Sequence, residues 1–144
     1  MNFRSVGAVL AGFVSIFAVT TAVDVALHAA GVFPPLGAYT TSGPLVIATG
    51  YRLLINTGGS YLTARLASAR PLFHALVLGA IGFVLSIAGG LAFRDLGPIW
   101  YPIAVIAMAP LCAWAGGRLR ELELARTHPL ATGRHDLAES RHVG

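Results

Sequence analysis

The chain has 144 residues, of which 56% are hydrophobic and 11% are charged, and its mean hydropathy is +0.72. A soluble domain carries about 25% charged residues, so this composition argues against a water-soluble globule and indicates one compact membrane domain. The formal charge of +4 comes from Arg residues scattered at the ends of apolar runs. That distribution argues against a nucleic-acid partner and fits the topology signal of a membrane protein.

Four apolar stretches are long enough to cross a hydrocarbon core, which takes about 20 helical residues. The predicted spans cover about residues 5–30, 44–67, 71–93 and 97–118. The runs are continuously apolar rather than alternating, which excludes a β-barrel, and a helix satisfies the backbone within lipid. We therefore predict an all-α, up-down-up-down four-helix transmembrane bundle in residues 1–126. A polar, disordered cytoplasmic tail is predicted for residues 127–144.

Gly and Pro residues mark the predicted connections between the spans. The breaking residues of the first connection are Gly31, Pro34, Pro35, Gly37 and Gly43. Pro71 suits the first turn of a helix, and Gly97 with Pro98 separates the last two spans. A secretory signal peptide is the alternative for the N-terminus. The apolar run is long for such a signal and continues through Asp24 into a helical polar stripe.

The Arg residues predict the orientation. Arg4 precedes the first span, Arg65 and Arg70 lie between the second and third, and the others follow the fourth. These last are Arg118, Arg120, Arg126, Arg134 and Arg141. Eight of the ten basic residues thus fall on one side, which the positive-inside rule makes cytoplasmic. We expect a multi-pass protein of the inner (cytoplasmic) membrane with both termini in the cytoplasm.

Two charged residues interrupt the predicted spans, and each costs about 2.5 to 3.5 kcal/mol within hydrocarbon on insertion scales. Asp24 and Arg52 are therefore expected to form a salt bridge near the outer leaflet, with His28 or Tyr51 as a further partner. Helical spacing adds more polar residues to the two facing stripes. The predicted polar seam comprises Asp24, Thr21 and His28 of the first span with Arg52, Asn56 and Ser60 of the second. One interpretation is a pair that fixes helix register, and the other is a polar cavity for an ion or small solute.

A stripe of small residues marks the third span. Gly79, Gly82, Ser86 and Gly89 recur at helical spacing and predict close helix packing, because small residues let backbones approach.

We predict no catalytic residue, cofactor or metal ligand. His28 and His74 lie near opposite faces and cannot share one haem iron, the tail histidines have no metal-site spacing, and Cys112 is read as a buried small hydrophobe.

Three segments carry a resemblance to other proteins. They are GGSYLTARLA at residues 58–67, RPLFHALVLG at 70–79 and GGRLR at 116–120. Together they resemble a pattern that recurs in small uncharacterised bacterial membrane proteins. The resemblance implies a bacterial inner membrane and the same four-helix arrangement, and it implies no activity.

The expected role is therefore non-enzymatic: a structural, accessory or interaction protein whose partners are the lipid bilayer and a second copy or another membrane protein. The alternative is a small oligomeric transporter or channel that uses the seam of Asp24, Arg52 and Asn56. A water-connected cavity that reaches Arg52 would favour transport, and a dry, closed seam would favour the structural role.

Overall fold

A computed structural model describes residues 3–127 of the chain, and these residues contain helices and no strand. The elements are α1 (Phe3–Ala29), α2 (Ser42–Leu66), α3 (Pro71–Ala92), a short 3-10 helix η1 (Arg94–Leu96) and α4 (Trp100–Thr127). The all-α, four-helix fold predicted from the sequence is confirmed. The tail prediction lies outside the described residues, apart from Thr127.

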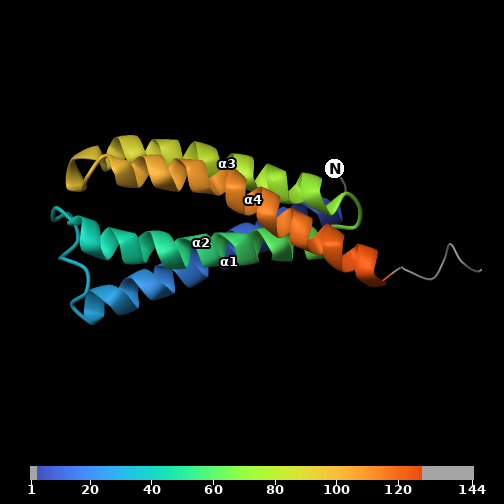
Figure 1. The fold of residues 1–144 in the computed structure, drawn as a ribbon, viewed down its shortest axis with the longest axis horizontal. Coiled ribbons are helices and arrows are strands. Elements are labelled where there is room, and N and C mark those ends of the chain that lie inside the picture. The colour runs from blue at the N-terminus through green and yellow to red at the C-terminus, as the bar shows by residue number, and fades with distance from the viewer. Residues whose placement is uncertain (1–2, 128–144) are drawn as a thin grey trace, which may run out of the picture.

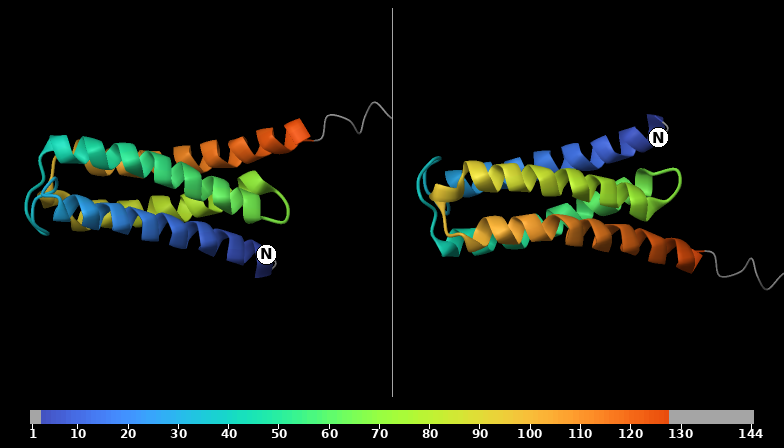
Figure 2. Two further views of the ribbon diagram at one scale, coloured as in Figure 1. Left: turned by 90° about the horizontal axis from the view of Figure 1, so that it is seen from below. Right: turned by 90° about the horizontal axis from the view of Figure 1, so that it is seen from above.

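Successive helices run in opposite directions (Figures 1 and 2). The start of α1, the α2–α3 connection and the end of α4 lie at one end of the bundle, which we call the inner end. The α1–α2 and α3–α4 connections lie at the other, the outer end (Figure 1). We refer below to the inner half (residues 3–15, 57–79 and 108–127) and the outer half (residues 16–56 and 80–107).

The connections follow the predicted breakers. Gly31 and Gly37 have φ values of 71° and 83°, a region that glycine enters without the steric cost other residues have. At the inner end, Arg70 has a φ of 50° immediately before Pro71, the first residue of α3. At the outer end, the backbone N–H of Thr40 donates to the carbonyl oxygen of Leu96 at 2.8 Å. This bond joins the two outer connections.

The bundle buries small side chains and exposes large ones. Its buried hydrophobic residues include five alanines: Ala8, Ala48, Ala64, Ala75 and Ala113. Large apolar side chains such as Phe17 (66% exposed) and Leu54 (73% exposed) point away from the bundle. A water-soluble protein arranges its large apolar residues the other way round, so this surface matches an apolar solvent.

Three helices, α1, α3 and α4, are long and apolar enough to cross a membrane. The sequence predicted four such spans, and α2 is not among the three. The difference has a physical reason, because α2 contains Arg52, Asn56 and several Ser, Thr and Gly residues in its 25 positions. Those polar residues are spread along the whole helix, so α2 has no stretch of membrane-spanning length as apolar as those of α1, α3 and α4.

Glycines bring the helix backbones into contact in the inner half. A Cβ atom added to Gly116 of α4 would lie 2.6 Å from the backbone nitrogen of Tyr61 and 2.7 Å from the carbonyl oxygen of Thr57, both on α2. A Cβ atom added to Gly12 of α1 would overlap the side chain of the buried Thr63 and would lie 2.9 Å from the carbonyl oxygen of Gly59, both on α2. The two glycines therefore let neighbouring helices approach more closely than a larger residue would, as small residues do.

The helix α4 is bent rather than straight (Figure 1). Pro110 lies in its interior, where a proline removes one helical hydrogen bond and kinks the helix. The inner half of α4 crosses toward α2, where Gly116 makes its close contact. The proline and the glycine thus act together to seat α4 on α2.

Candidate functional site

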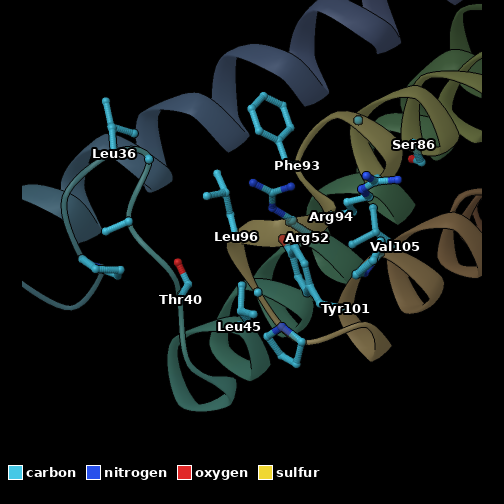
Figure 3. Close-up of a pocket in the computed structure, with 18 of the residues that line it drawn as sticks. Leu36, Thr40, Leu45, Arg52, Ser86, Phe93, Arg94, Leu96, Tyr101 and Val105 are labelled. Carbon is cyan, nitrogen blue, oxygen red and sulfur yellow. The ribbon is translucent and has the colours of Figure 1, made fainter.

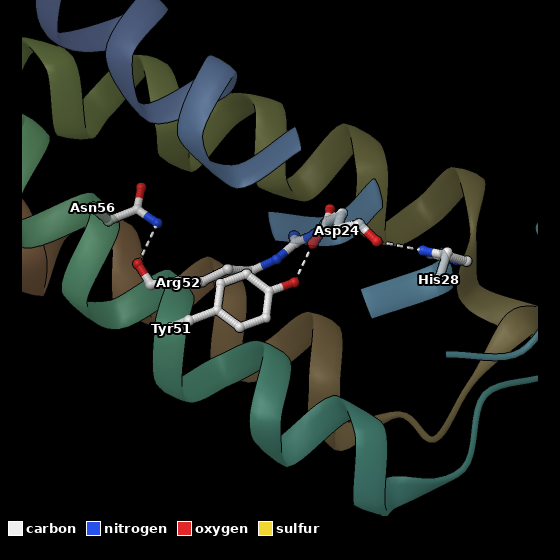
Figure 4. Close-up of polar contacts among 5 residues, drawn as sticks. All are labelled: Asp24, His28, Tyr51, Arg52 and Asn56. Atoms are coloured by element: carbon white, nitrogen blue, oxygen red, sulfur yellow. Dashed lines mark hydrogen bonds and ion pairs between the residues drawn. The ribbon is translucent and has the colours of Figure 1, made fainter. Parts of the chain in front are cut away.

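A salt bridge joins α1 to α2 in the outer half (Figure 4). The Nη2 atom of Arg52 donates to Oδ2 of Asp24 at 2.7 Å. The hydroxyl of Tyr51 donates to the other carboxylate oxygen, Oδ1. The structure contains the predicted pair of Asp24 and Arg52. The sequence named His28 or Tyr51 as a further partner, and in the structure Tyr51 is the one that bonds to the carboxylate.

The imidazole of His28 takes a different acceptor. Its Nδ1 donates to the backbone carbonyl oxygen of Asp24, one helical turn earlier, at 2.7 Å (Figure 4). The ring also packs edge-on against Phe33, with 5.2 Å between ring centroids. This residue therefore closes the outer end of α1 instead of joining the salt bridge.

The other residues of the predicted seam point in several directions. Asn56 donates to the carbonyl oxygen of Arg52 on its own helix at 2.7 Å. Ser60 is buried beside Gly116 of α4, and Thr21 is exposed. The polar contact between α1 and α2 in the outer half is thus concentrated on Asp24, Tyr51 and Arg52.

A cavity of about 600 Å³ lies beside this salt bridge in the outer half (Figure 3). All four helices and both outer connections contribute to its wall. Its polar lining includes Arg52 of α2, Ser86 of α3 and Tyr101 of α4, with Arg94 of η1 near the outer end. Leu85, Phe93, Leu96 and Val105 supply apolar surface. The volume lies within the range of small-molecule sites, about 300 to 1,000 Å³.

The small-residue stripe of α3 divides between the two halves. Gly79 packs against Ala113 of α4, as predicted for the whole stripe. Gly82, Ser86 and Gly89 line the cavity. A Cβ atom added to Gly82 would also contact Ala109 of α4, whereas one added to Gly89 would meet nothing within 4 Å. Within this stripe, Gly79 thus closes the bundle in the inner half, whereas Ser86 and Gly89 border open space in the outer half.

Tyr101 is a cavity residue that the sequence did not reveal. Its ring packs edge-on against that of the adjacent Trp100, with 5.8 Å between ring centroids, but the two side chains have different polar surroundings. The indole Nε1 of Trp100 donates to Ser42 at 3.2 Å, whereas Tyr101 lines the cavity with Arg52. One sequence feature could have indicated this role: Trp100 and Tyr101 are adjacent in the first turn of α4, and adjacent residues of a helix point in different directions.

A second polar cluster ties α2 to α4 at the inner end. Glu123 of α4 accepts hydrogen bonds from the hydroxyl of Tyr61 and from Arg120, each at 2.7 Å. These two bonds, the first from Tyr61, lower the pKa of the Glu123 carboxyl, because donors to the ionised form stabilise it. The cluster links the two helices where α4 leaves the bundle.

The remaining reactive groups make no further site. Cys112 is buried in the inner half, and its Sγ lies 3.6 Å from the carbonyl oxygen of Leu53. Within residues 3–127, no three His, Cys, Asp or Glu side chains lie close enough together to hold a metal ion.

No protein-family model matches the chain, and no curated protein or solved structure matches it either. The salt bridge and the cavity beside it are therefore the features from which a function has to be argued.

Proposed function

We propose that this chain is a four-span membrane protein, with both termini in the cytoplasm, that binds a small solute in the cavity of its outer half. In this role it is a non-enzymatic accessory or interaction protein of a bacterial inner membrane. The observation that carries the proposal is the cavity of about 600 Å³ lined by Arg52. A pair that served only to fix helix register would need no such space.

The arrangement of the helices supports the proposal that α2 also crosses the membrane. The helices α1 and α3 are each long and apolar enough to span a membrane, and they run in the same direction (Figure 1). The chain has to return between them, and α2 is the element that does so. Its charged residue, Arg52, is paired with Asp24, as a charge at membrane depth requires.

The closed inner half favours binding over conduction. Gly12 and Gly116 bring helix backbones close together there, Gly79 packs against the Cβ atom of Ala113, and Ala75 and Ala113 are fully buried. A path through one copy of the bundle would have to cross this packed layer. The alternative, a transporter or channel, shares the same cavity and would need the inner half to open or a second copy to complete the path.

Site-directed labelling tests the orientation. Single cysteines replace Leu36 and Leu122 in a Cys112→Ala background, and a membrane-impermeant thiol reagent is added to right-side-out vesicles. We expect the cysteine at residue 36 to react and the one at residue 122 to react only after permeabilisation. Reaction of both from the same side would contradict the four-span topology.

Conductance in planar bilayers separates binding from conduction. The wild type is compared with Gly89→Leu, which places a large side chain in the open space beside residue 89. We expect no current from either protein. A sustained current from the wild type that Gly89→Leu removes would favour the channel alternative.

A further inference from the structure

The lining of the cavity is positively charged. Arg52 and Arg94 both contribute to it, together with His28, and no carboxylate of the described residues does. The carboxylate of Asp24 holds Arg52 from outside the cavity wall. A bound cation would therefore meet two guanidinium groups and no carboxylate in the lining, whereas an anion would meet two favourable partners.

The salt bridge leaves the guanidinium of Arg52 with spare donors. A guanidinium carries five N–H groups, and the structure gives Arg52 one acceptor, the Oδ2 atom of Asp24. Its Nε is buried without a hydrogen-bond partner among the described residues. A buried donor without an acceptor is costly and rare in proteins, so Arg52 has the capacity to bind a further oxygen anion after a small adjustment of its side chain.

Arg94 supplies the second positive charge from a different position. It lies in η1, after the end of α3, with 70% of its side chain exposed. Its nearest carboxylate, Asp95, is 3.5 Å away and 87% exposed, so this contact is weak. The guanidinium is therefore free to turn toward a ligand that enters from the outer end.

Apolar surface makes up much of the remaining wall. Leu85 of α3, Phe93 directly after α3 and Val105 of α4 all line the cavity. Gly82 and Gly89 add stretches of helix surface without side chains, against which a flexible chain can lie. A small hydrated anion would leave this surface unfilled, so the lining fits a ligand with both a charged head and an apolar body.

We propose that the cavity binds an amphiphilic anion, whose oxygen head group lies between Arg52 and Arg94 and whose acyl chain lies along the glycine-lined face of α3. The proposal rests on the proposed function, since it assigns a ligand class to the same cavity. A fatty-acid carboxylate and the phosphodiester of a membrane lipid share this chemistry. Guanidinium groups pair well with both, and the experiment distinguishes the two sources.

Binding to the full-length protein in a neutral detergent tests the charge requirement. The probes are a fluorescent fatty acid, the fatty alcohol with the same chain, and inorganic phosphate. We expect the fatty acid to bind about tenfold or more tightly than the alcohol, since one charge-assisted contact contributes about that factor. Phosphate should compete poorly because it has no apolar body. Equal affinity for the acid and the alcohol would overturn the proposal.

Variants place the ligand in the cavity. Arg94→Gln should weaken the fatty acid about fivefold to tenfold and leave the alcohol unchanged, because it removes one charge-assisted contact. Gly89→Leu should weaken both ligands, because it fills the space of the chain. Arg118→Gln, at the inner end, is the matched control and should change neither. The Arg94→Gln variant should fold like the wild type, because the side chain of Arg94 is 70% exposed. If it binds both ligands like the wild type, the head-group assignment is wrong.

Native mass spectrometry separates the two sources. The protein is extracted from membranes, and the masses that remain bound are identified before any probe is added. A retained anionic phospholipid or a retained fatty acid would each support the ligand class and name its source. Retention of zwitterionic lipid alone, with no preference for the fatty-acid probe, would overturn it. A cavity that opens to water but binds no amphiphilic anion would reject this inference and leave the proposed function standing.

Discussion

The two halves of the bundle use the same residue types for opposite purposes. In the inner half, Gly12, Gly79 and Gly116 lie so close to a neighbouring helix that a Cβ atom added to any of them would overlap it. In the outer half, Gly89 of the same α3 stripe meets nothing within 4 Å and lines a cavity. The inner half is held mainly by close packing, whereas the contacts of the outer half include the ion pair of Asp24 with Arg52 and hydrogen bonds such as that from Trp100 to Ser42. A stripe of glycines therefore indicates a helix face without side chains, and the position of the neighbouring helix determines whether that face is buried.

The largest effect is expected where a side chain would meet backbone. Gly116→Leu should prevent stable folding, since its Cβ alone would lie 2.6 Å from the Tyr61 nitrogen. Overpacking costs about 1 to 3 kcal/mol even when side chains can move aside, and backbone atoms yield less. Gly89→Leu is the matched substitution and should fold. Thermal unfolding, followed by a thiol-reactive dye at the buried Cys112, measures both; similar Tm values for the two variants would remove the contrast between the halves.

The ion pair of the outer half should give the next largest effect. Asp24→Asn leaves the Arg52 charge without its partner, and we expect a loss of about 2 kcal/mol. That is less than the about 3 to 5 kcal/mol for a fully buried pair, because the two side chains keep 27% and 28% of their surface exposed.

A double-mutant cycle isolates this pair. The variant that combines Asp24→Asn with Arg52→Gln should lose less free energy of unfolding than the sum of the two single losses. Additive losses would mean that the two groups do not stabilise each other.

Tyr51→Phe should have a smaller effect. It removes the hydrogen bond to Asp24 and leaves the ion pair intact, so a loss of about 1 to 2 kcal/mol is expected, as for a bond to a charged group. Denaturant unfolding of the variant provides the measurement. The same substitution in the Asp24→Asn background should cost less, and an equal cost in both backgrounds would place the contribution of Tyr51 elsewhere.

The smallest effect concerns pH at the inner end. The folded pKa of Glu123 is lowered by Tyr61 and Arg120, so its contribution to stability is present above the unfolded pKa. That contribution is lost as the pH falls through the lower folded value. The Tm difference between wild type and Glu123→Gln should be constant near neutral pH and shrink as the pH falls below about 4.3, the ordinary value for Glu. Tyr61→Phe should reduce that difference, and a difference that grows in acid would contradict the assignment.

The fold could be predicted from the sequence because few backbone structures are stable for an apolar chain in hydrocarbon. Helix type, number and approximate limits follow from run length and from Gly and Pro. The pairing of Asp24 with Arg52 was also readable, since an unpaired charge in lipid is costly. In both cases a single strong physical requirement acts on a few residues.

The cavity was not readable, because it depends on how far the helices separate. Periodicity places Gly79 and Gly89 on one face of α3, yet it does not say where α4 leaves that face. For the same reason, periodicity places Thr21 in the predicted seam, although its side chain is exposed. The sequence of a helix shows which residues share a face, but only the packing of the neighbouring helices determines what that face contacts.

Thiol accessibility along α3 tests the contrast between the two halves most directly. Single cysteines replace Gly79, Gly82, Ser86 and Gly89, one at a time, in a Cys112→Ala background, and each variant is treated with an impermeant thiol reagent from the outer side. We predict reaction at residues 86 and 89, weaker reaction at 82 and none at 79, in folded protein. Uniform protection along all four positions, or reaction at 79 equal to that at 89, would contradict an open outer half above a closed inner half.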